Sequence, residues 1–532
     1  MSYQTEVQKR RTFAIISHPD AGKTTLTEKL LLYGGAVQLA GSVAAKKQQR
    51  QATSDWMALE KQRGISITST VLNFEYNGYH INLLDTPGHQ DFSEDTYRTL
   101  MAADSVIMLL DNAKGVETQT KKLYQVCKRR GIPVATFINK MDRPGREPLE
   151  LLDEVEKLFD IKTCAFNWPI GMGDTFKGVY DRRQKKLNLF ERTDHGKYRA
   201  PVSVSDVHDE AVKEQMPADV YNQLVEEIEI LDMAGEEFSE DAYLAGLMTP
   251  VFFGSAANNF GVELFLSQFL ELAPPPSERP ARNGAGDMQV DPADTNFSGF
   301  IFKIQANMDP QHRDRIAFMR VCSGQFARDM QVKHPRTGKM IRLSHSHRLF
   351  GQDRETINEA YAGDIVGLSS NDQFAIGDTI CVGPTFEFEP IPSFAPETFA
   401  LLRNPNPSKY KQFQKGIDQL RQEGAVQVMY FADAAARNPI MAAVGPLQFE
   451  VVQHRLQNEY GVDTQLERLM EYTHARWLQG DADAMAKVEW IVNARKAEDA
   501  DGRPVALVKG EWALNYMMEK NPHIRFLDTP PV

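Results

Sequence analysis

Apolar positions follow two different periods at the start of the chain, and the change of period marks its first elements. A β-branched run, AIIS, begins at Ala14, and apolar residues recur at helical spacing from Leu26. The turn Ala21-Gly22-Lys23-Thr24 lies between the two segments. The pattern predicts a strand, a loop and a helix in residues 14–34, and proteins commonly hold phosphate groups in such loops.

Further apolar segments extend this alternation. Residues 70–85, TVLNFEYNGYHINLLD, read as two strands, and Asn77-Gly78 between them is typical of a type I′ hairpin turn. Residues 104–111 and 132–142 are two more apolar strands, separated by a helical stretch from about residue 116 to residue 130. Strands alternating with helices favour an α/β fold with a sheet rich in parallel pairs.

Proline-rich stretches divide the chain of 532 residues, whose length is typical of three or four domains. From about residue 296, short alternating segments with turn signals predict a β-barrel, and an α/β module follows the second proline-rich stretch. We expect a first α/β domain at 1–275 with an insertion at about 160–245, a linker at 276–295, a β-barrel at 296–389, a proline-rich joint at 390–408, and a third α/β domain with a C-terminal extension at 409–532.

Charge and composition exclude several classes of protein. The net charge is −12, from 60 basic and 72 acidic side chains, which argues against a general nucleic-acid binder. No apolar run reaches the roughly 18 residues of a membrane span, and the first residues lack the apolar segment of a signal peptide. We therefore expect a cytoplasmic protein with no membrane partner. The four cysteines form no CxxC pair and suit buried positions in a reducing compartment.

The first loop carries a candidate phosphate-binding motif. The pattern G-x-x-x-x-G-K-[ST] is matched in residues 17–24 except at its first glycine, which is serine here. The candidate residues are Ser17, His18, Pro19, Asp20, Ala21, Gly22, Lys23 and Thr24. Backbone N–H groups of such a loop wrap phosphates, while Lys23 reaches the outer phosphates and the Thr24 hydroxyl is a ligand for Mg²⁺.

A second motif stands where the second strand of the hairpin ends, and the C-terminal ends of strands are where ligands bind in open α/β sheets. It reads Asp85-Thr86-Pro87-Gly88-His89. A carboxylate at Asp85 can support the Mg²⁺ shell, and the Gly88 backbone N–H can face a γ-phosphate. Taken alone, the same residues are typical of an ordinary Pro-Gly turn.

A third motif indicates the nucleobase. Residues Asn139-Lys140-Met141-Asp142 end the strand at 132–142. An ionised Asp142 only accepts hydrogen bonds, so it suits the N1–H and 2-amino donors of guanine and selects GTP over ATP. Asn139 and the aliphatic stem of Lys140 can complete the pocket. The backbone of Ser255-Ala256, after a strand that begins near residue 250, can meet the guanine O6.

The segment from Arg63 to Thr68 lies between the first two motifs, where Ser66 offers a second hydroxyl to Mg²⁺. Together, SHPDAGKTT, RGISI, DTPGH, NKMD and GSA resemble the motifs of the translational GTPases, and the chain is most similar to their class II release factors. The resemblance covers nearly the whole chain. Residues 308–326 look like the start of that family's second-domain β-barrel, and residues 442–463 look like the third domain shared with elongation factor G. Two positions depart from the general pattern. Ser17 replaces the first glycine of the phosphate-loop motif, and Ser66 stands where most translational GTPases have threonine.

This resemblance implies a P-loop GTPase domain with an insertion, then a β-barrel, then an α/β domain. It implies a monomer that binds GTP or GDP with Mg²⁺ held by Thr24 and Ser66, and that hydrolyses GTP when stimulated by the ribosome. Ribosomal RNA and proteins of the factor-binding site would be its partners. The protein would stimulate the activity of class I release factors and promote their dissociation from the ribosome after peptide release. His89 would orient the attacking water, with Pro19 and Ile65 flanking its path.

Other functions remain open at this stage. A ribosome assembly factor, a guanine-nucleotide switch or a rescue factor like elongation factor G would carry the same nucleotide motifs. Elongation factor G and its relatives carry two further C-terminal domains, including the one that enters the decoding site. The length after Glu471 is too short for them, which argues against a translocase. His89 alone would also suit a surface histidine after a turn.

Overall fold

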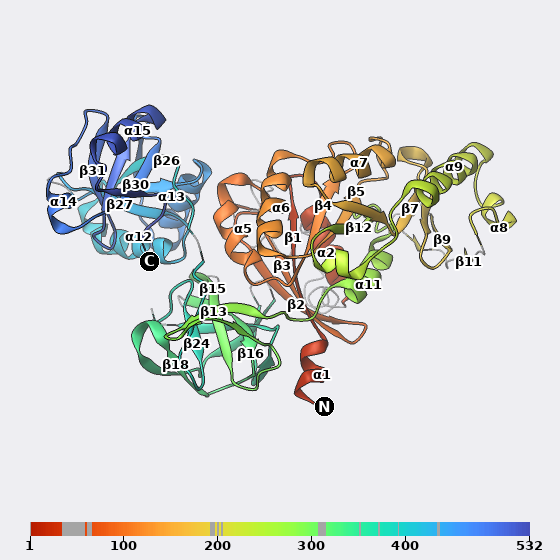
Figure 1. The fold of residues 1–532 in the computed structure, drawn as a ribbon, viewed down its shortest axis with the longest axis horizontal. Coiled ribbons are helices and arrows are strands. Elements are labelled where there is room, and N and C mark those ends of the chain that lie inside the picture. Colours follow the sequence, from red (N-terminus) through yellow and green to blue (C-terminus); the bar gives the residue numbers. More distant parts are fainter. Residues whose placement is uncertain are drawn as a thin grey trace.

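The computed structural model describes residues 2–34, 59–60, 66–191, 197–198, 202–203, 206–306, 315–350, 353–370, 373–391, 393–433 and 437–531. Figure 1 shows an N-terminal α/β region in red to light green, a β-rich region in green and teal below it, and a C-terminal α/β region in blue beside both. The fold is therefore the multidomain α/β arrangement expected from the sequence, with a β-barrel-like domain between two α/β domains.

The N-terminal region is built on a sheet with strand order β2-β3-β1-β4-β5-β12-β6. The neighbouring pairs of this sheet are parallel except β2 with β3, which are antiparallel. Its elements are α1 (Tyr3–Gln8), β1 (Arg10–Ser17), α2 (Lys23–Tyr33), β2 (Thr70–Tyr76), β3 (Tyr79–Asp85), η1 (Gln90–Phe92), α5 (Ser93–Leu100), β4 (Ser105–Asp111), α6 (Thr118–Arg130), β5 (Val134–Asn139), α7 (Pro148–Phe159), β6 (Lys162–Ala165), β12 (Met248–Phe253) and α11 (Val262–Leu272). Asn77 and Gly78 have φ of 49° and 81°, which confirms the predicted type I′ hairpin.

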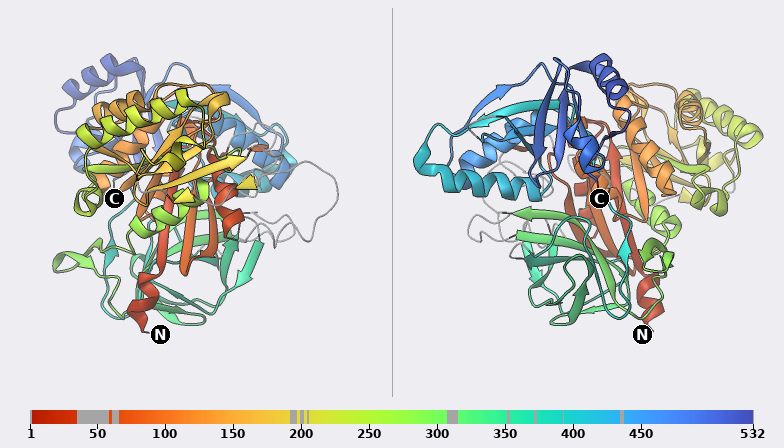
Figure 2. Two further views of the ribbon diagram at one scale, coloured as in Figure 1. Left: turned by 90° about the vertical axis from the view of Figure 1, so that its right-hand side faces the viewer. Right: turned by 60° about the vertical axis from the view of Figure 1, so that its left-hand side comes forward.

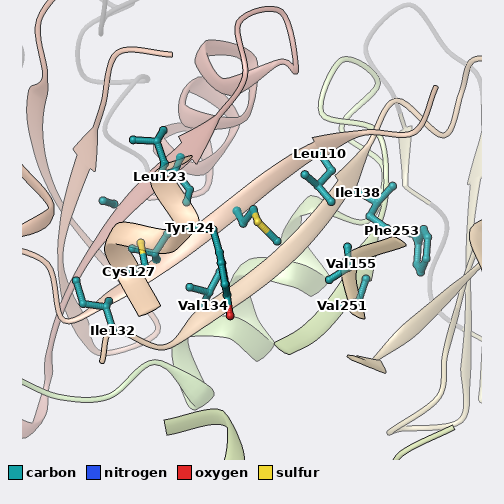
Figure 3. Packing of buried hydrophobic residues seen from close by; sticks show 14 of the residues in the cluster. Leu110, Leu123, Tyr124, Cys127, Ile132, Val134, Ile138, Val155, Val251 and Phe253 are labelled. Carbon is teal, nitrogen blue, oxygen red and sulfur yellow. The ribbon is translucent and has the colours of Figure 1, made fainter. Parts of the chain in front are cut away.

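The apolar runs of the sequence become the central strands of this sheet. Every residue of β1 and of β4 is buried. Figure 3 shows Leu110 of β4 and Ile138 of β5 in one layer with Leu123 and Tyr124 of α6. Because both faces of the central strands are covered, these strands carry continuous apolar runs rather than alternating ones. This packing fixes the strand ends from which the candidate motifs emerge.

A small subdomain is inserted between β6 and β12, at the right-hand edge of Figure 1. It contains β7 (Asn167–Ile170), η2 (Gly173–Thr175), β8 (Gly178–Asp181), β9 (Lys186–Glu191), β10 (Lys197–Tyr198), β11 (Val202–Ser203), α8 (Glu210–Lys213), α9 (Ala218–Ala234) and α10 (Glu240–Leu244). Its strands form a separate antiparallel sheet with order β10-β9-β8-β7, and β11 pairs with β9.

The second region is an antiparallel, barrel-like arrangement of short strands. Its elements are β13 (Arg279–Asn283), β14 (Gly286–Val290), β15 (Ser298–Ala306), β16 (Arg315–Ser323), β17 (Gln325–Ala327), β18 (Gln331–His334), η3 (Pro335–Thr337), β19 (Lys339–Arg342), β20 (Ser346–Phe350), β21 (Asp353–Thr356), β22 (Glu359–Tyr361), β23 (Ile365–Ser370), β24 (Thr379–Cys381) and β25 (Glu387–Phe388). The segment expected as a linker at 276–295 forms the β13–β14 hairpin, and β13 pairs with β25.

The β-barrel is joined to the N-terminal domain through buried polar contacts and through one shared strand pair. Leu72 of β2 pairs with Phe350 of β20, so the two sheets are continuous. Arg320 of β16 is buried and forms an ion pair with the buried Asp104 of the N-terminal domain. The Thr12 hydroxyl of β1 donates to the carbonyl of Gly363 in the barrel at 2.7 Å. An unpaired charge at these positions would be costly, so these contacts hold the two domains in one arrangement.

The third region is an α/β domain on an antiparallel sheet with order β29-β26-β28-β27-β31-β32-β30-β33. It contains β26 (Thr398–Arg403), η4 (Pro407–Lys409), α12 (Tyr410–Gln422), β27 (Gln427–Phe431), β28 (Ile440–Ala443), α13 (Leu447–Tyr460), β29 (Gln465–Arg468), β30 (His474–Gln479), α14 (Ala482–Ala486), β31 (Ala494–Asp499), β32 (Pro504–Val508), α15 (Gly510–Lys520) and β33 (Arg525–Leu527). Strand β26 lies within the expected joint at 390–408, and the expected extension supplies β30 to β33 to the same sheet.

The two views in Figure 2 show the third domain close to both other domains. Figure 1 shows its helices α12 and α13 on the side nearest to them. The four cysteines are buried and unpaired, as the sequence predicts. None of the described helices combines the length and apolar character that a bilayer-crossing helix requires.

Candidate nucleotide-binding site

A cavity of about 310 Å³ opens where β1, β3 and β5 end. This is the edge of a parallel sheet at which ligands bind. Its lining includes residues from the predicted motifs, namely Ser17, His18, Pro19, Asp20, Gly22, Lys23, Thr24, Ser66, Gly88, His89, Asn139, Lys140 and Asp142. The three strand ends bring together segments that are more than a hundred residues apart in the chain.

The loop between β1 and α2 has the shape of a phosphate cradle. Asp20 and Gly22 adopt left-handed conformations with φ of 68° and 97°, and α2 begins at Lys23 directly after them. A Cβ on Gly22 would lie 2.4 Å from Asn139 Nδ2, so this position requires glycine for space as well as for conformation. Ser17 has no positive φ, so serine fits the place of the usual first glycine without strain.

Lys23 lines the cavity, and its side chain is almost completely buried. Its Nζ donates to Asp85 Oδ1 at 2.6 Å and lies 3.5 Å from the Ser66 hydroxyl. The Thr27 hydroxyl, one turn further along α2, also donates to Asp85 Oδ1, at 3.2 Å. Asp85 is therefore a buried acceptor behind the cavity rather than part of its lining.

Several other predicted residues lie behind the lining as well. The Thr86 hydroxyl donates to the Ile15 carbonyl at 2.6 Å, which ties the end of β3 to β1. Met141 is fully buried, and its N–H donates to the Gly254 carbonyl at 3.1 Å. The predicted residues that the cavity does not expose are Ala21, Asp85, Thr86, Pro87, Met141, Ser255 and Ala256.

Asn139 joins the phosphate loop to the loop after β12. Its Nδ2 donates to the Ala21 carbonyl at 2.8 Å, and its Oδ1 accepts the Ala256 N–H at 2.8 Å. The amide is buried and uses both ends in these contacts. These two bonds fix the two loops relative to each other. The sequence predicts that the backbone of Ser255-Ala256 meets the guanine O6, and in the structure the Ala256 N–H donates to Asn139.

Lys140 and Asp142 line the cavity from the loop that follows β5. Lys140 Nζ forms an ion pair with Asp111 Oδ2 at 2.7 Å, which extends its aliphatic stem along the cavity wall. Asp142 Oδ2 accepts a hydrogen bond from Asn258 Nδ2 at 2.9 Å. Its Oδ1 is buried, and no donor from the described residues satisfies it. A buried carboxylate oxygen without a donor is costly, so this atom calls for a ligand that donates.

The segment that contains Ser66 is held by a buried carboxylate on its N-terminal side. Glu60 is fully buried, and its Oε1 accepts from the N–H groups of Ile67 at 2.9 Å and Thr68 at 3.1 Å. These bonds keep the residues after Ser66 against the domain, which leaves the Ser66 side chain facing Lys23. Arg63, Gly64 and Ile65 lie outside the described residues, so the expected flanking role of Ile65 is not placed.

The other end of this segment meets the β-barrel. Asp95 Oδ2 accepts from the N–H and from the hydroxyl of Ser69, each at 2.6 Å, and Lys303 of β15 donates to the Ser69 carbonyl. Burial alone would raise the pKa of Asp95, but the charges of Lys303 and Arg98 and the bonds from Ser69 hold that pKa below its usual value. Burial lowers the pKa of Lys303.

His89 stands at the rim of the cavity, with its side chain 33% exposed. Its Nδ1 accepts the Asp91 N–H at 3.2 Å, and the ring lies near Phe92 with a centroid distance of 6.1 Å. A Cβ on the preceding Gly88 would lie 3.3 Å from the Pro19 nitrogen, so the two loops approach closely here.

Three lining residues were missed by the sequence reasoning: Thr25, Arg143 and Ala257. Thr25 is the last residue of the stretch SHPDAGKTT, and Arg143 and Ala257 directly follow predicted motifs. Their position at the edge of a motif was the available signal. The contact from Lys140 to Asp111 was missed as well. A charged residue at the C-terminal end of the neighbouring β4 was the available indication of it.

Comparison with known proteins agrees with this geometry. Residues 8–275 match the family model described as "Elongation factor Tu GTP binding domain", and residues 296–383 match "Elongation factor G domain 2". Residues 388–518 match "Class II release factor RF3, C-terminal domain". A protein of Gloeobacter violaceus named "Peptide chain release factor 3" is 60% identical over 528 residues, which cover 99% of this chain and 98% of that relative.

The chain belongs to the peptide chain release factor 3 family. Members named in the same way in Cyanothece sp. and Trichodesmium erythraeum are 59% and 58% identical, each over 99% of this chain and 97% of the relative. A crystal structure of a protein from Thermus thermophilus has a TM-score of 0.69 at 21% identity and covers 89% of this chain and 71% of that chain. This last likeness concerns the fold alone.

Membership in the release factor 3 family makes the first domain a guanine-nucleotide-binding GTPase domain and makes the protein a factor of translation termination. The sequence resemblance to class II release factors is thereby confirmed.

Proposed function

We propose that this protein hydrolyses GTP on the ribosome and thereby promotes the dissociation of class I release factors after peptide release. The observation that carries the nucleotide part is that Asp142, with one buried oxygen that lacks a donor among the described residues, lines the same cavity as the loop between β1 and α2. The termination part rests on family membership over nearly the whole chain.

Asp142 would select the base. Guanine presents N1–H and 2-amino donors on one edge, which suits a carboxylate with one buried oxygen still without a donor. Adenine has an acceptor at the same edge, so it would leave the carboxylate unpaired, and such a loss is worth several kcal/mol in discrimination. The aliphatic stem of Lys140 would cover one face of the base. Asn139 would hold the phosphate loop and the loop after β12 in fixed positions relative to each other.

The phosphates would lie against the start of α2. Backbone N–H groups of the first turn of a helix have no partner within the helix and attract anions. Lys23 would leave Asp85 and pair with the outer phosphates, because the phosphate charge is the larger one.

The donor set also fits Mg²⁺. The hydroxyls of Thr24 and Ser66 line the same cavity, and the Asp85 carboxylate lies behind them within 2.6 Å of Lys23. Hydroxyl, carboxylate and phosphate oxygens are the hard ligands that Mg²⁺ prefers. When bound, the ion neutralises phosphate charge during hydrolysis. Thr24 and Ser66 would hold it directly, and Asp85 would act through water.

His89 would orient the attacking water. Its Nδ1 accepts the Asp91 N–H, so a neutral ring carries its proton on Nε2, the nitrogen left to meet a water at the rim of the cavity. Contact with the ribosome would supply the fixed ring position that hydrolysis requires. Water positioning acts mainly in the transition state, so this residue would contribute to turnover rather than to nucleotide affinity.

The output would be a change in how the domains sit. Two segments link the cavity to the other domains. The segment around Ser66 lines the cavity and contacts the β-barrel, and the segment from Gly88 to Arg98 lines the cavity and contacts the third domain. With a γ-phosphate bound, both segments would close on it, and hydrolysis would release them. The two arrangements of the domains would bind the ribosome with different affinities, and this difference would displace a bound class I release factor.

The decisive experiment measures the residence time of a labelled class I release factor on post-termination ribosomes. Addition of this protein with GTP should shorten the residence time, and the Lys23→Ala variant should not shorten it. Lys29→Ala is the matched control, because Lys29 lies on the same helix α2 and does not line the cavity. A residence time unchanged by the wild-type protein would favour an assembly or rescue role.

A further inference from the structure

Asp91 lies between His89 and the third domain, and its carboxylate faces both. Its Oδ1 lies 3.4 Å from His89 Nδ1. Its Oδ2 accepts the N–H of Leu447, the first residue of α13, at 2.8 Å. The Asp91 side chain is only 5% exposed. A single buried carboxylate therefore connects the ring proposed to orient water with a helix of another domain.

The helix end is well suited to this carboxylate. The first N–H groups of α13 have no acceptor within the helix, and the positive end of the helix dipole favours a negative charge there. Gly445 lets the two domains approach closely, because a Cβ at this position would lie 2.1 Å from Asp91 Cγ. The backbone of Gly445 has no positive φ, so the need for glycine is the space that Asp91 fills and not a special conformation.

An apolar contact lies directly beside the polar one. Ile67, Phe92 and Val451 form a buried cluster against which Leu447 packs. Ile67 follows Ser66, Phe92 follows Asp91, and Val451 and Leu447 lie on α13. The start of α13 thus contacts both of the segments that line the nucleotide cavity, and removal of the third domain from this position would expose apolar surface on each.

We propose that Asp91 is a positioning residue that makes the orientation of His89 depend on the docking of α13. With α13 docked, Leu447 anchors one carboxylate oxygen, and the backbone N–H and the other oxygen of Asp91 hold the Nδ1 edge of the ring. A neutral ring accepts the Asp91 N–H at Nδ1, and a ring protonated there donates to Oδ1, so both charge states are held with Nε2 outward. With α13 undocked, Asp91 loses its anchor. This inference rests on the proposed role of His89.

The test uses the full chain with ribosomes and compares Asp91→Ala, Gly445→Ala and the double variant. For each, kcat and KM of ribosome-stimulated GTP turnover are measured together with the affinity for GTP in the absence of ribosomes. Each single change should lower kcat about tenfold or more while the affinity for GTP stays unchanged, because a displaced catalytic group costs rate and not binding. Gly284→Ala is the matched control, because a Cβ there meets no atom within 4 Å.

The double variant separates positioning from general damage to the third domain. A methyl group at position 445 displaces the carboxylate only while Asp91 is present, so the double variant should turn over no more slowly than Asp91→Ala alone. Losses that multiply in the double variant would overturn the proposal. If Asp91→Ala does not fold, Gly445→Ala carries the test, since it leaves the carboxylate in the chain and only displaces it.

Wild type and His89→Ala are measured in parallel. If the wild type is stimulated by ribosomes and His89→Ala is defective, but Asp91→Ala and Gly445→Ala keep the wild-type kcat, this inference fails and the proposed function stands. If His89→Ala turns over like the wild type, the proposed role of His89 fails and the inference falls with it.

Discussion

Lys23 lines the cavity and its Nζ lies 2.6 Å from Asp85 Oδ1, so the cation that would meet the phosphates is paired with a buried carboxylate behind the lining. This pair stabilises two charges that would otherwise be buried alone. A nucleotide that binds here must offer Lys23 a stronger partner than Asp85. Phosphate groups would do so, and the carboxylate would then keep the Thr27 hydroxyl as its donor.

Lys23→Ala should therefore lose both GTP and GDP binding, because neither the outer phosphates nor Asp85 would have a cation. We expect affinity to fall by at least about a hundredfold, as for a charge-assisted bond removed from a buried site. Titration with fluorescent GDP and GTP measures this effect. Lys29→Ala should bind like the wild type, and full affinity in Lys23→Ala would contradict the phosphate assignment.

Asp142→Asn should change the base that is bound. An amide can donate where the carboxylate only accepts, so the variant should disfavour guanine and favour xanthine, whose oxygen replaces the 2-amino group. We expect the affinity for xanthine nucleotides relative to guanine nucleotides to change by several kcal/mol. Competition between GDP and xanthosine diphosphate reports it, with Asp153→Asn on the exposed side of α7 as the control. Unchanged preference for GDP would refute the role of Asp142.

Lys303→Met should weaken GTP binding more than GDP binding. The methionine keeps the aliphatic stem but removes the donor to the Ser69 carbonyl and the charge 3.6 Å from Asp95 Oδ2. The Ser66 segment would contact the nucleotide fully only when a γ-phosphate is present, so a loosened segment lowers the GTP-to-GDP affinity ratio, by about three- to tenfold. Lys333→Met on β18 of the same domain is the control, and an equal loss for both nucleotides would argue against this coupling.

Asp95→Asn should lower the free energy of unfolding at neutral pH, and the difference from the wild type should disappear in acid. Folding lowers the pKa of the Asp95 carboxyl, so its charge stabilises the folded state at pH values above the pKa of the unfolded chain, which is about 3.9. This contribution disappears as the pH falls through the pKa of Asp95 in the folded protein. We expect a difference of about 1–3 kcal/mol between wild type and variant at pH 7. Thermal unfolding from pH 7 to pH 3 measures it, and a difference that grows in acid would contradict the assigned sign.

The elements that rest on local pattern could be predicted from the sequence. The Asn77-Gly78 turn and the apolar run of β4 each carry their signal within a few residues, and both are found where expected. The motif residues converge because parallel strands end at one edge. What local pattern could not give is the partner of a polar group. The bonds from Asn139 to Ala21 and to Ala256 join residues more than a hundred positions apart.

The domain edges show the same limit. Prolines near residue 390 suggested a connecting segment, yet Thr398–Arg403 pairs with β28 and β29 as an inner strand of the third-domain sheet. Lys303 occupies a strand position that would suit an apolar residue, and its neighbour Asp95 is 208 positions earlier. Such pairings depend on how whole domains pack, which periodicity along the chain does not report.

The sheet shared between β2 and β20 has a mechanical consequence. Strand pairing between Leu72 and Phe350 and the buried ion pair between Arg320 and Asp104 connect the barrel to the GTPase domain. A sliding motion between these two domains would break backbone hydrogen bonds and leave a buried charge without its partner. The third domain instead meets its neighbour through contacts such as Arg98 with the Gly424 carbonyl and Asp91 with Leu447, which can part without unravelling a sheet. The third domain can therefore separate from the GTPase domain without the loss of strand pairing. We expect nucleotide-dependent amide exchange to concentrate where the two domains meet, around Asp91, Gly424 and Leu447.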